Sequence, residues 1–428
     1  MEKTPPWWGA DLRGNREILT NQNKTEEGEM AIIQGTKARV ILDSRGNETL
    51  EVDVLLDDGT LGRVSVPSGA STGSHEAYKI QDMRQSVQNI KSLTTQIVGL
   101  DPAQQERVDS ILLQTDGTED KSKMGANVIL ALSLATASAA ARSMKKPLHT
   151  HLHSIAGLQA PERMPTPMFN IINGGKHADN NLEFQEFMVV PSPDTSSFRE
   201  KVTIGRTVFH TLKKILHQMG HSTSVGDEGG FAPRLNSNQE AIELIVEAIR
   251  ATEYQPRTNA SVALDAAASS IPDLAAVTYP LDPIGYYDKL VTDYPIISLE
   301  DPLTEDDWQG WTKLTAQLGS KVMVVGDDLY TTNPKRLKEG IDRKATNAVI
   351  IKPDQIGSLT ETFQTMRLAE QAGFHRVISH RSGETESTFI ADLAVGTGAE
   401  FIKTGAPSRG ERVAKYNQLL RIEEELLG

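Results

Sequence analysis

In the second half of the chain, short and largely apolar runs recur at a nearly even pace, and each ends at an ionisable residue. Six residues directly follow such runs: Asp265 after SVAL, Glu300 after PIISL, Asp327 after MVVG, Lys352 after AVII, His380 after RVIS and Lys403 after EFI. The spacing matches one strand, one loop and one returning helix. A charge at the end of a buried strand is costly unless it is paired or bound. The pattern therefore predicts a (β/α) barrel whose C-terminal mouth gathers these six side chains.

The first part of the chain has a different pattern. Across residues 36–66, alternating apolar and polar positions around Asp57-Asp58-Gly59 predict a small antiparallel meander. Helical periodicity follows and predicts two or three helices between about residues 82 and 142. The apolar run that begins at Val128 is too short and too rich in Ser and Thr to span a bilayer, so it predicts a buried helix.

These patterns divide the chain into three parts. Residues 1–29 are polar and lack periodicity, so we expect a flexible extension. Residues 30–160 form the predicted α+β domain, and residues 161–428 form the predicted barrel domain. The prolines of PERMPTP, residues 161–167, predict a linker. From Met168 onward we expect strands and helices to alternate up to the C-terminus.

Composition narrows the classes of function. The chain has 428 residues, of which 38% are apolar, and a formal net charge of −13. The negative charge argues against non-specific binding to nucleic acid or to an anionic membrane. The chain contains no cysteine, which excludes disulfides, thiolate zinc sites and cysteine nucleophiles. This composition fits a cytoplasmic location.

Two glycine-rich motifs carry further candidate residues. In NIINGGKHADNNLEFQEF, the glycine pair places His177 in a loop, and Gln185 and Glu186 end a short alternating run, so these two neighbours are not expected to face the core together. In SVGDEGGFAP, Glu228 precedes a double glycine that lets a ligand approach the backbone closely. We interpret Glu228 as a general acid, because a carboxyl that its surroundings keep protonated can donate to a poor leaving group.

The strand-end acids predict a metal site. Asp265, Glu300 and Asp327 offer hard oxygen ligands, a set that suits Mg²⁺ rather than zinc. Any one of them alone is more often a helix cap or part of a surface ion pair. Three acids at successive strand ends favour a shared cation.

The strand-end bases predict proton transfer and phosphate binding. Lys352 is a candidate base, because Lys403 and a metal in the same pocket would disfavour its ammonium form. Arg381 and Ser382 stand beside His380 and supply a planar fork and a hydroxyl, the groups that grip a phosphate. We expect Lys352 and Glu228 to lie on opposite sides of one substrate-sized cavity.

Taken together, these segments resemble the enolase family over nearly the whole chain from about Met30. The matching stretches are ILDSRGN, VPSGASTG, NIINGGKHADNNLEFQEF, VGDEGGFAP, SLEDPLTEDDW, GDDLYTTNP, SHRSGETE and KTGAPSRGERVAKYNQLLRIEEEL. The resemblance implies the enolase fold, an α/β protein in which a smaller α+β N-terminal domain precedes a modified, partly antiparallel (β/α)8 barrel. It also implies the Mg²⁺-dependent, reversible dehydration of 2-phosphoglycerate to phosphoenolpyruvate in glycolysis, by a hydro-lyase that is at least a homodimer.

The resemblance implies a role for each candidate residue. One Mg²⁺ would be held by Asp265, Glu300 and Asp327, and a second would be held with the help of Ser71. Lys352 would remove the C2 proton, and Glu228 would protonate the departing C3 hydroxyl with Glu186 beside it. The substrate would be bound by His177, Gln185, His380, Arg381, Ser382 and Lys403.

Some positions depart from the family pattern. The segment between Glu76 and Ser86 is shorter than usual, and Asp354 stands where the family usually has asparagine. An added negative charge at Asp354 is expected to raise the pKa of Lys352. Two alternatives therefore stay open. One is an enolase-like paralogue that acts on a related phosphorylated or phosphonylated hydroxy acid, and the other is a catalytically weak binding protein on an enolase scaffold.

Overall fold

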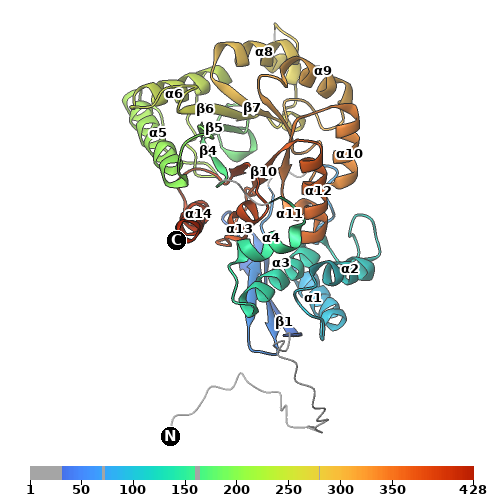
Figure 1. Ribbon diagram of the computed structural model, residues 1–428. Helices are drawn as coiled ribbons and strands as arrows, with labels where there is room; N and C mark the ends of the chain where they lie inside the picture. The colour runs from blue at the N-terminus through green and yellow to red at the C-terminus, as the bar shows by residue number, and fades with distance from the viewer. Residues whose placement is uncertain (1–30, 70–72, 160–163, 279) are drawn as a thin grey trace, which may run out of the picture. The chain divides into compact units, whose positions relative to one another are not determined.

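The structure is a computed structural model that describes residues 31–69, 73–159, 164–278 and 280–428 (Figure 1). The expected flexible extension, residues 1–29, lies outside the described residues, and so does Ser71.

The N-terminal part contains the predicted meander and helices. Strands β1 (Ile33–Leu42), β2 (Glu48–Leu56) and β3 (Leu61–Ser65) form an antiparallel sheet in the order β1-β2-β3. The helices that follow are α1 (Met83–Ile97), α2 (Gln105–Asp116), α3 (Ala126–Ser143) and α4 (Leu148–Ala156). Asp82 caps α1 by accepting hydrogen bonds from the first-turn N–H groups, as a helix start requires. Both predictions for this region are confirmed.

Helix α3 is the apolar segment that the sequence predicted to be buried. By length and composition it is the one helix among the described residues that is apolar enough to cross a membrane, and 89% of it is buried inside the protein. It packs against β2 and β3, where Gly62 lets the two backbones come close. It is therefore the central core helix of this domain, and the prediction is confirmed.

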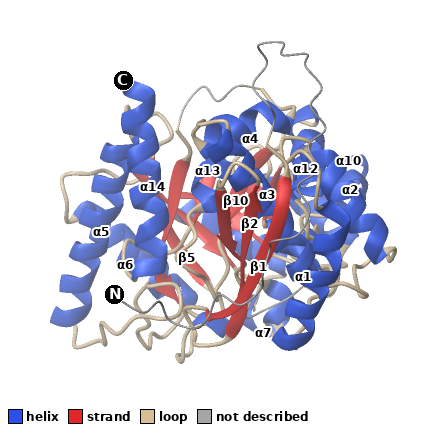
Figure 2. Ribbon diagram, turned by 90° about the horizontal axis from the view of Figure 1, so that it is seen from below, coloured by secondary structure: helices blue, strands red, loops and turns tan. Residues whose placement is uncertain are grey.

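The C-terminal part is a closed barrel with the strand order β10-β11-β4-β5-β6-β7-β8-β9. Its strands are β4 (Thr166–Asn173), β5 (Glu186–Pro191), β6 (Ala260–Asp265), β7 (Ile296–Glu300), β8 (Met323–Gly326), β9 (Ala348–Ile351), β10 (His375–Ser379) and β11 (Phe401–Lys403). Its helices are α5 (Phe198–Gln218), α6 (Asn238–Arg250), α7 (Leu274–Thr278), α8 (Pro283–Asp293), α9 (Trp308–Leu318), α10 (Pro334–Arg343), α11 (Pro353–Ile356), α12 (Leu359–Gln371), α13 (Phe389–Gly396) and α14 (Gly410–Leu427). Figure 2 shows the strands enclosed by these helices.

Two expectations about this region were wrong in detail. Strands and helices do not alternate strictly, because β4 is followed directly by β5 apart from one 3-10 turn, and both α5 and α6 precede β6. Strand β5 pairs antiparallel with β4 and with β6. The linker predicted over residues 161–167 is also too long, because β4 already begins at Thr166.

The reversed direction of β5 decides where its first residue lies. Glu186 begins β5 and pairs in register with Asp265, the last residue of β6. The start of β5 therefore lies at the mouth of the barrel, where the parallel strands end. The expectation that Gln185 and Glu186 end a run and face different ways was wrong, since both are buried at that mouth.

Hydrogen bonds between the two parts of the chain place small-domain loops at the barrel mouth. The N–H of Ser44 donates to the carbonyl of Glu384 over 2.7 Å, and that of Ser68 donates to Gly383 over 2.7 Å. Deeper in the contact, the buried carboxylate of Asp109 accepts from the N–H and hydroxyl of Thr360 at 2.9 and 2.6 Å. These contacts bring loops of the first domain to the strand ends of the second.

Candidate active site

The structure brings the strand-end residues together. Asp265 pairs in register with Glu300, and Lys403 pairs with Ser379 directly before His380. All are buried except Lys352, whose side chain is 12% exposed. One enclosed cavity is lined by eleven of the predicted residues: His177, Gln185, Glu186, Glu228, Asp265, Asp327, Lys352, His380, Arg381, Ser382 and Lys403. Glu300 lies at its edge, within reach of Lys403.

Lys403 bridges the carboxylates on three neighbouring strands. Its Nζ lies 2.7 Å from Glu300 Oε1, 3.2 Å from Asp265 Oδ2 and 3.3 Å from Glu186 Oε1. Burial disfavours the ammonium form, but the three carboxylates outweigh burial and hold the pKa of Lys403 well above its usual value. Lys403 is therefore a fixed positive charge.

The acidic set fits a hard divalent cation. All its donors are oxygens, which such ions prefer. Glu300 Oε2 is buried and has no hydrogen-bond partner among the described residues. Burial, followed by the charge of Asp265, raises the pKa of Glu300 well above its usual range. A cation bound here would offset the repulsion between these carboxylates and would give the unpartnered oxygen of Glu300 a partner.

Two further acids support this set, and sequence reasoning gave them no role. Asp301 accepts hydrogen bonds from the N–H groups of Asp327 and Asp328 at 2.9 and 2.8 Å, and so holds the backbone at the end of β8. Carboxylate oxygens of Asp301, Asp327 and Asp328 lie within 4.8 Å of one another. Burial and then Asp327 raise the pKa of Asp328 to about 7. The signal for both was adjacency, since they directly follow Glu300 and Asp327.

Lys352 forms an ion pair with Asp327, whose other oxygen accepts from Gln355 Nε2 at 2.9 Å. Burial lowers the pKa of Lys352, but the Asp327 carboxylate outweighs burial, so the pKa is raised. Among the protein's own groups Asp327 thus favours the ammonium form, whereas the neutral amine was expected beside Lys403 together with a bound metal. A cation at Asp327 would compete for the carboxylate that stabilises the ammonium form.

Glu186, Glu228 and His177 form a second cluster on the cavity wall. His177 Nδ1 lies 3.7 Å from Glu186 Oε1 and 3.6 Å from Glu228 Oε1. Burial raises the pKa of Glu186, and the charge of Glu228 raises it further, well above its usual value. In Glu228, burial is outweighed by His380 and His177, and the pKa lies well below its usual value. The surroundings therefore favour a proton on Glu186 over one on Glu228, whereas Glu228 was expected from the sequence to be the carboxyl held protonated.

Arg412, at the start of α14, sets the orientation of His380. Its guanidinium is fully buried and donates to His380 Nδ1, to Arg381 O and to Ser382 O, each over 2.6 Å. Because Nδ1 accepts from a permanent cation, the ring proton belongs on Nε2, which lies 3.2 Å from Glu228 Oε2. Burial lowers the pKa of His380 to about 4, so the ring is neutral. The sequence signal for Arg412 was its place in the long motif after Lys403.

Arg381 and Ser382 directly follow His380 and also line the cavity. Arg381 Nη2 donates to Glu76 Oε1 over 2.9 Å, and its Nη1 lies 3.4 Å from Asp354 Oδ2. Lys79 Nζ lies 2.7 Å from Asp354 Oδ2. The charge of Asp354 is therefore balanced by Arg381 and Lys79.

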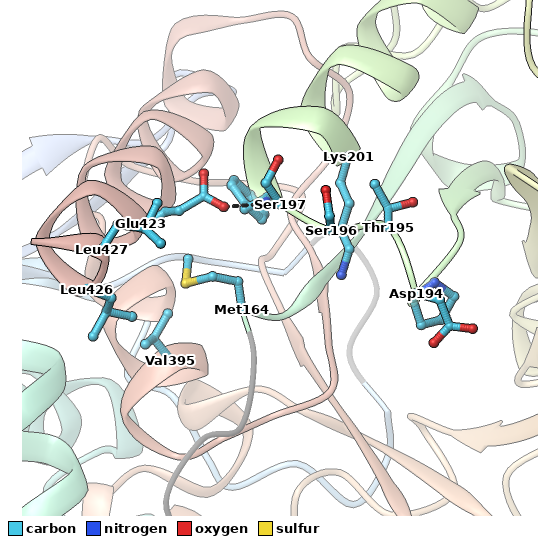
Figure 3. A pocket seen from close by; sticks show the side chains of 12 residues that line it. Met164, Asp194, Thr195, Ser196, Ser197, Lys201, Val395, Glu423, Leu426 and Leu427 are labelled. Atoms are coloured by element: carbon cyan, nitrogen blue, oxygen red, sulfur yellow. Dashed lines mark hydrogen bonds between the residues drawn. The ribbon is translucent and has the colours of Figure 1, made fainter.

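The cavity is smaller than expected. Its free volume is about 20 Å³, which accommodates about one water. A larger cavity, of about 560 Å³, lies between the start of α5 and the end of α14 (Figure 3). There Glu423 accepts a hydrogen bond from the N–H of Arg199 over 3.0 Å and caps α5. The chemistry is concentrated in the small cavity, so a substrate must displace side chains or open loops to enter.

Comparison with known families agrees with this architecture. Residues 33–152 match the family model described as "Enolase, N-terminal domain". Residues 161–428 match the one described as "Enolase, C-terminal TIM barrel domain".

Proposed function

The chain belongs to the enolase family, and on this basis we propose that it catalyses the Mg²⁺-dependent, reversible dehydration of 2-phosphoglycerate to phosphoenolpyruvate. The observation that carries the proposal is the cavity itself. The cavity and its edge bring four kinds of group together: a lysine, two carboxyls whose pKa values shift in opposite directions, a set of oxygen ligands, and an arginine with an adjacent serine.

The residues divide the elimination between them. Lys352 Nζ, as the neutral amine, takes the proton from C2 and becomes the ammonium, and the electron pair of that C–H bond forms the C2–C3 double bond. The C3–O bond breaks, and the hydroxide leaves as water with a proton from the Glu186/Glu228 pair. Arg381 and Ser382 hold the phosphate, while His177, Gln185, His380 and Lys403 orient the rest of the substrate.

Metal ions complete this site. We propose that Asp265, Glu300 and Asp327 hold one Mg²⁺ and that Ser71 contributes to a second. Mg²⁺ bound by these residues would supply positive charge that offsets the negative charge built up as C2 loses its proton.

The proposal is tested by following the ultraviolet absorbance of phosphoenolpyruvate after adding 2-phosphoglycerate and Mg²⁺. We expect a steady rise with the wild-type protein and almost none with Lys352→Ala. A wild-type signal no greater than that of Lys352→Ala would reject the assignment.

A paralogue with a related substrate is the second candidate. It is favoured by the Lys79–Asp354 ion pair beside Arg381, which introduces charge next to the proposed phosphate site. Assaying phosphorylated and phosphonylated hydroxy acids in parallel distinguishes the two. A clear preference for 2-phosphoglycerate removes the second candidate.

We further propose that the protein is a cytoplasmic homodimer, because members of the enolase family are typically oligomeric. Exposed apolar side chains on the edge strand β1, Val40 and Leu42, support a partner surface. Sedimentation velocity measures the oligomeric state directly.

A further inference from the structure

Arg381 is held by two carboxylates that approach it from different parts of the chain. Glu76 belongs to the N-terminal domain and contacts Nη2, whereas Asp354 lies in α11 of the barrel and contacts Nη1. Arg381 lines the cavity, while among the described residues neither Glu76 nor Asp354 does. The two acids therefore contact the guanidinium on the side that faces away from the cavity.

Lys79 completes this group and balances its charge. Its Nζ lies 2.8 Å from Glu76 Oε2 and 2.7 Å from Asp354 Oδ2. The group then contains two carboxylates and two cations, and no side chain in it is more than 12% exposed. Buried charges are tolerated when each is paired, and removal of one partner leaves an uncompensated charge.

Glu76 and Lys79 lie on a segment, residues 73–79, that docks on the barrel loops. The N–H of Ala77 donates to Gln355 O over 2.8 Å, and Thr331 Oγ1 donates to His75 O over 3.2 Å. Gly73 approaches so closely that a Cβ there would lie 2.9 Å from Thr331 Cγ2. When this segment docks, it therefore places the Glu76 carboxylate against Arg381.

We propose that Glu76 and Asp354 are positioning residues for Arg381, that Lys79 neutralises their surplus charge, and that docking of residues 73–79 thereby sets the affinity of the site for a phosphate group. The inference rests on the proposed function, in which Arg381 binds the substrate phosphate. The hydrogen bond from Nη2 to Glu76 and the ion pair between Nη1 and Asp354 restrain the guanidinium, and a planar fork binds phosphate well only in the correct orientation.

The charge balance of the group couples the effects of substitutions at Lys79 and Asp354. With Lys79 removed, two carboxylates share one guanidinium, and the surplus negative charge repels a phosphate dianion. With Asp354 also changed to asparagine, the side chain keeps an oxygen near Nη1 to position Arg381, while Glu76 alone balances its charge and the neutrality of the group returns. The effect of the double change is therefore smaller than that of Lys79→Met alone.

The experiment compares Lys79→Met, Glu76→Gln and Lys79→Met/Asp354→Asn with the wild type. We expect Lys79→Met and Glu76→Gln to raise KM for 2-phosphoglycerate roughly tenfold, with kcat changed by less than about twofold, since a buried pair near the ligand is broken. We expect the double variant to recover to within about threefold of the wild-type KM. A contact that served only the fold would change the amount of active protein and leave KM unaltered.

The matched control is Lys335→Met. Lys335 pairs with Glu119, so this pair also joins the N-terminal domain to the barrel, but both side chains are exposed and lie outside the cavity lining. We expect its KM to equal that of the wild type. An equal KM rise in this control, or a double variant as impaired as Lys79→Met, overturns the proposal.

A second readout separates this inference from the proposed reaction. Inorganic phosphate is titrated into each variant, and the rise in the thermal unfolding midpoint reports binding. The inference can hold even if the wild type does not turn over 2-phosphoglycerate. In that case it is still supported if phosphate raises the unfolding midpoint less in Lys79→Met and Glu76→Gln than in the double variant. An equal rise in all variants, or no rise in the wild type, overturns it. Glu76→Gln and the double variant keep the test available if Lys79→Met fails to fold.

Discussion

Glu186 and Glu228 lie side by side, yet the pKa of one is raised and that of the other is lowered. Both are buried, so the difference comes from the groups around them. Glu228 lies beside His380 and His177, which lower its pKa, and it accepts a hydrogen bond from the amide of Asn170 over 2.9 Å. Glu186 lies beside Glu228, whose charge adds to burial and raises its pKa. At the scale of single residues, the neighbours rather than burial decide in which direction each pKa moves.

The two glutamates should respond differently to replacement by glutamine, which resembles a protonated carboxyl. We expect Glu186→Gln to change the free energy of unfolding by less than about 1 kcal/mol, because the raised pKa of Glu186 favours its neutral form. Glu228→Gln should cost roughly 1.5–3 kcal/mol, because the buried Asn170 amide and the neighbouring His380 and His177 lose an anionic partner. Urea denaturation at pH 7 measures both, and a greater loss in Glu186→Gln would contradict the assignment of the proton.

At the scale of elements, close approaches of backbone shape the N-terminal domain. Strand β3 lies against α3 at Gly62, where a Cβ would stand 2.3 Å from both Ala135 O and Ala139 N. Atoms that close cannot be relieved by a rotamer change, since both belong to the helix backbone. The contact of strand and helix therefore depends on the absence of a side chain at this one position.

Gly62→Ala should destabilise the protein by roughly 1–3 kcal/mol, because the helix must move away from the sheet. The matched control is Gly35→Ala in β1, where a Cβ would meet nothing within 4 Å. We expect the control to keep the wild-type stability in the same denaturation experiment. Equal stability of the two variants would show that β3 and α3 leave room for a Cβ at position 62.

At the scale of the whole molecule, the candidate metal site draws its acids from the ends of three successive strands, β6, β7 and β8. Without a cation, Lys403 and Lys352 neutralise these carboxylates. A bound divalent ion would add further neutralisation across neighbouring strands. Metal binding should therefore stabilise the folded barrel as a unit.

Saturating Mg²⁺ should raise the thermal unfolding midpoint, and excess EDTA should reverse the rise. An ion at a hundred times its Kd contributes about 2.7 kcal/mol. Asp265→Asn should lose most of this effect, while Glu253→Gln, which changes an exposed acid in the loop after α6, should keep it. No shift with Mg²⁺ in the wild type would contradict the metal site.

The sequence by itself determined six barrel strands, β6 to β11, and the residues at their ends, because each follows from a local pattern of apolar residues closed by a charge. Asp265, Glu300 and Lys403 were found in this way, and so was the buried helix α3. The direction of β5 was not readable from such a pattern, because strand direction depends on which strand becomes its neighbour.

The pairing of charges was decided only by the tertiary structure. Arg412 contacts His380, which lies 32 positions away in the sequence, and Arg381 contacts Glu76, which lies 305 positions away. The raised pKa of Glu186, the raised pKa of Lys352 and the neutralisation of Asp354 all depend on such distant partners. An electrostatic environment is a sum over neighbours in space, and the order of residues along the chain does not contain it.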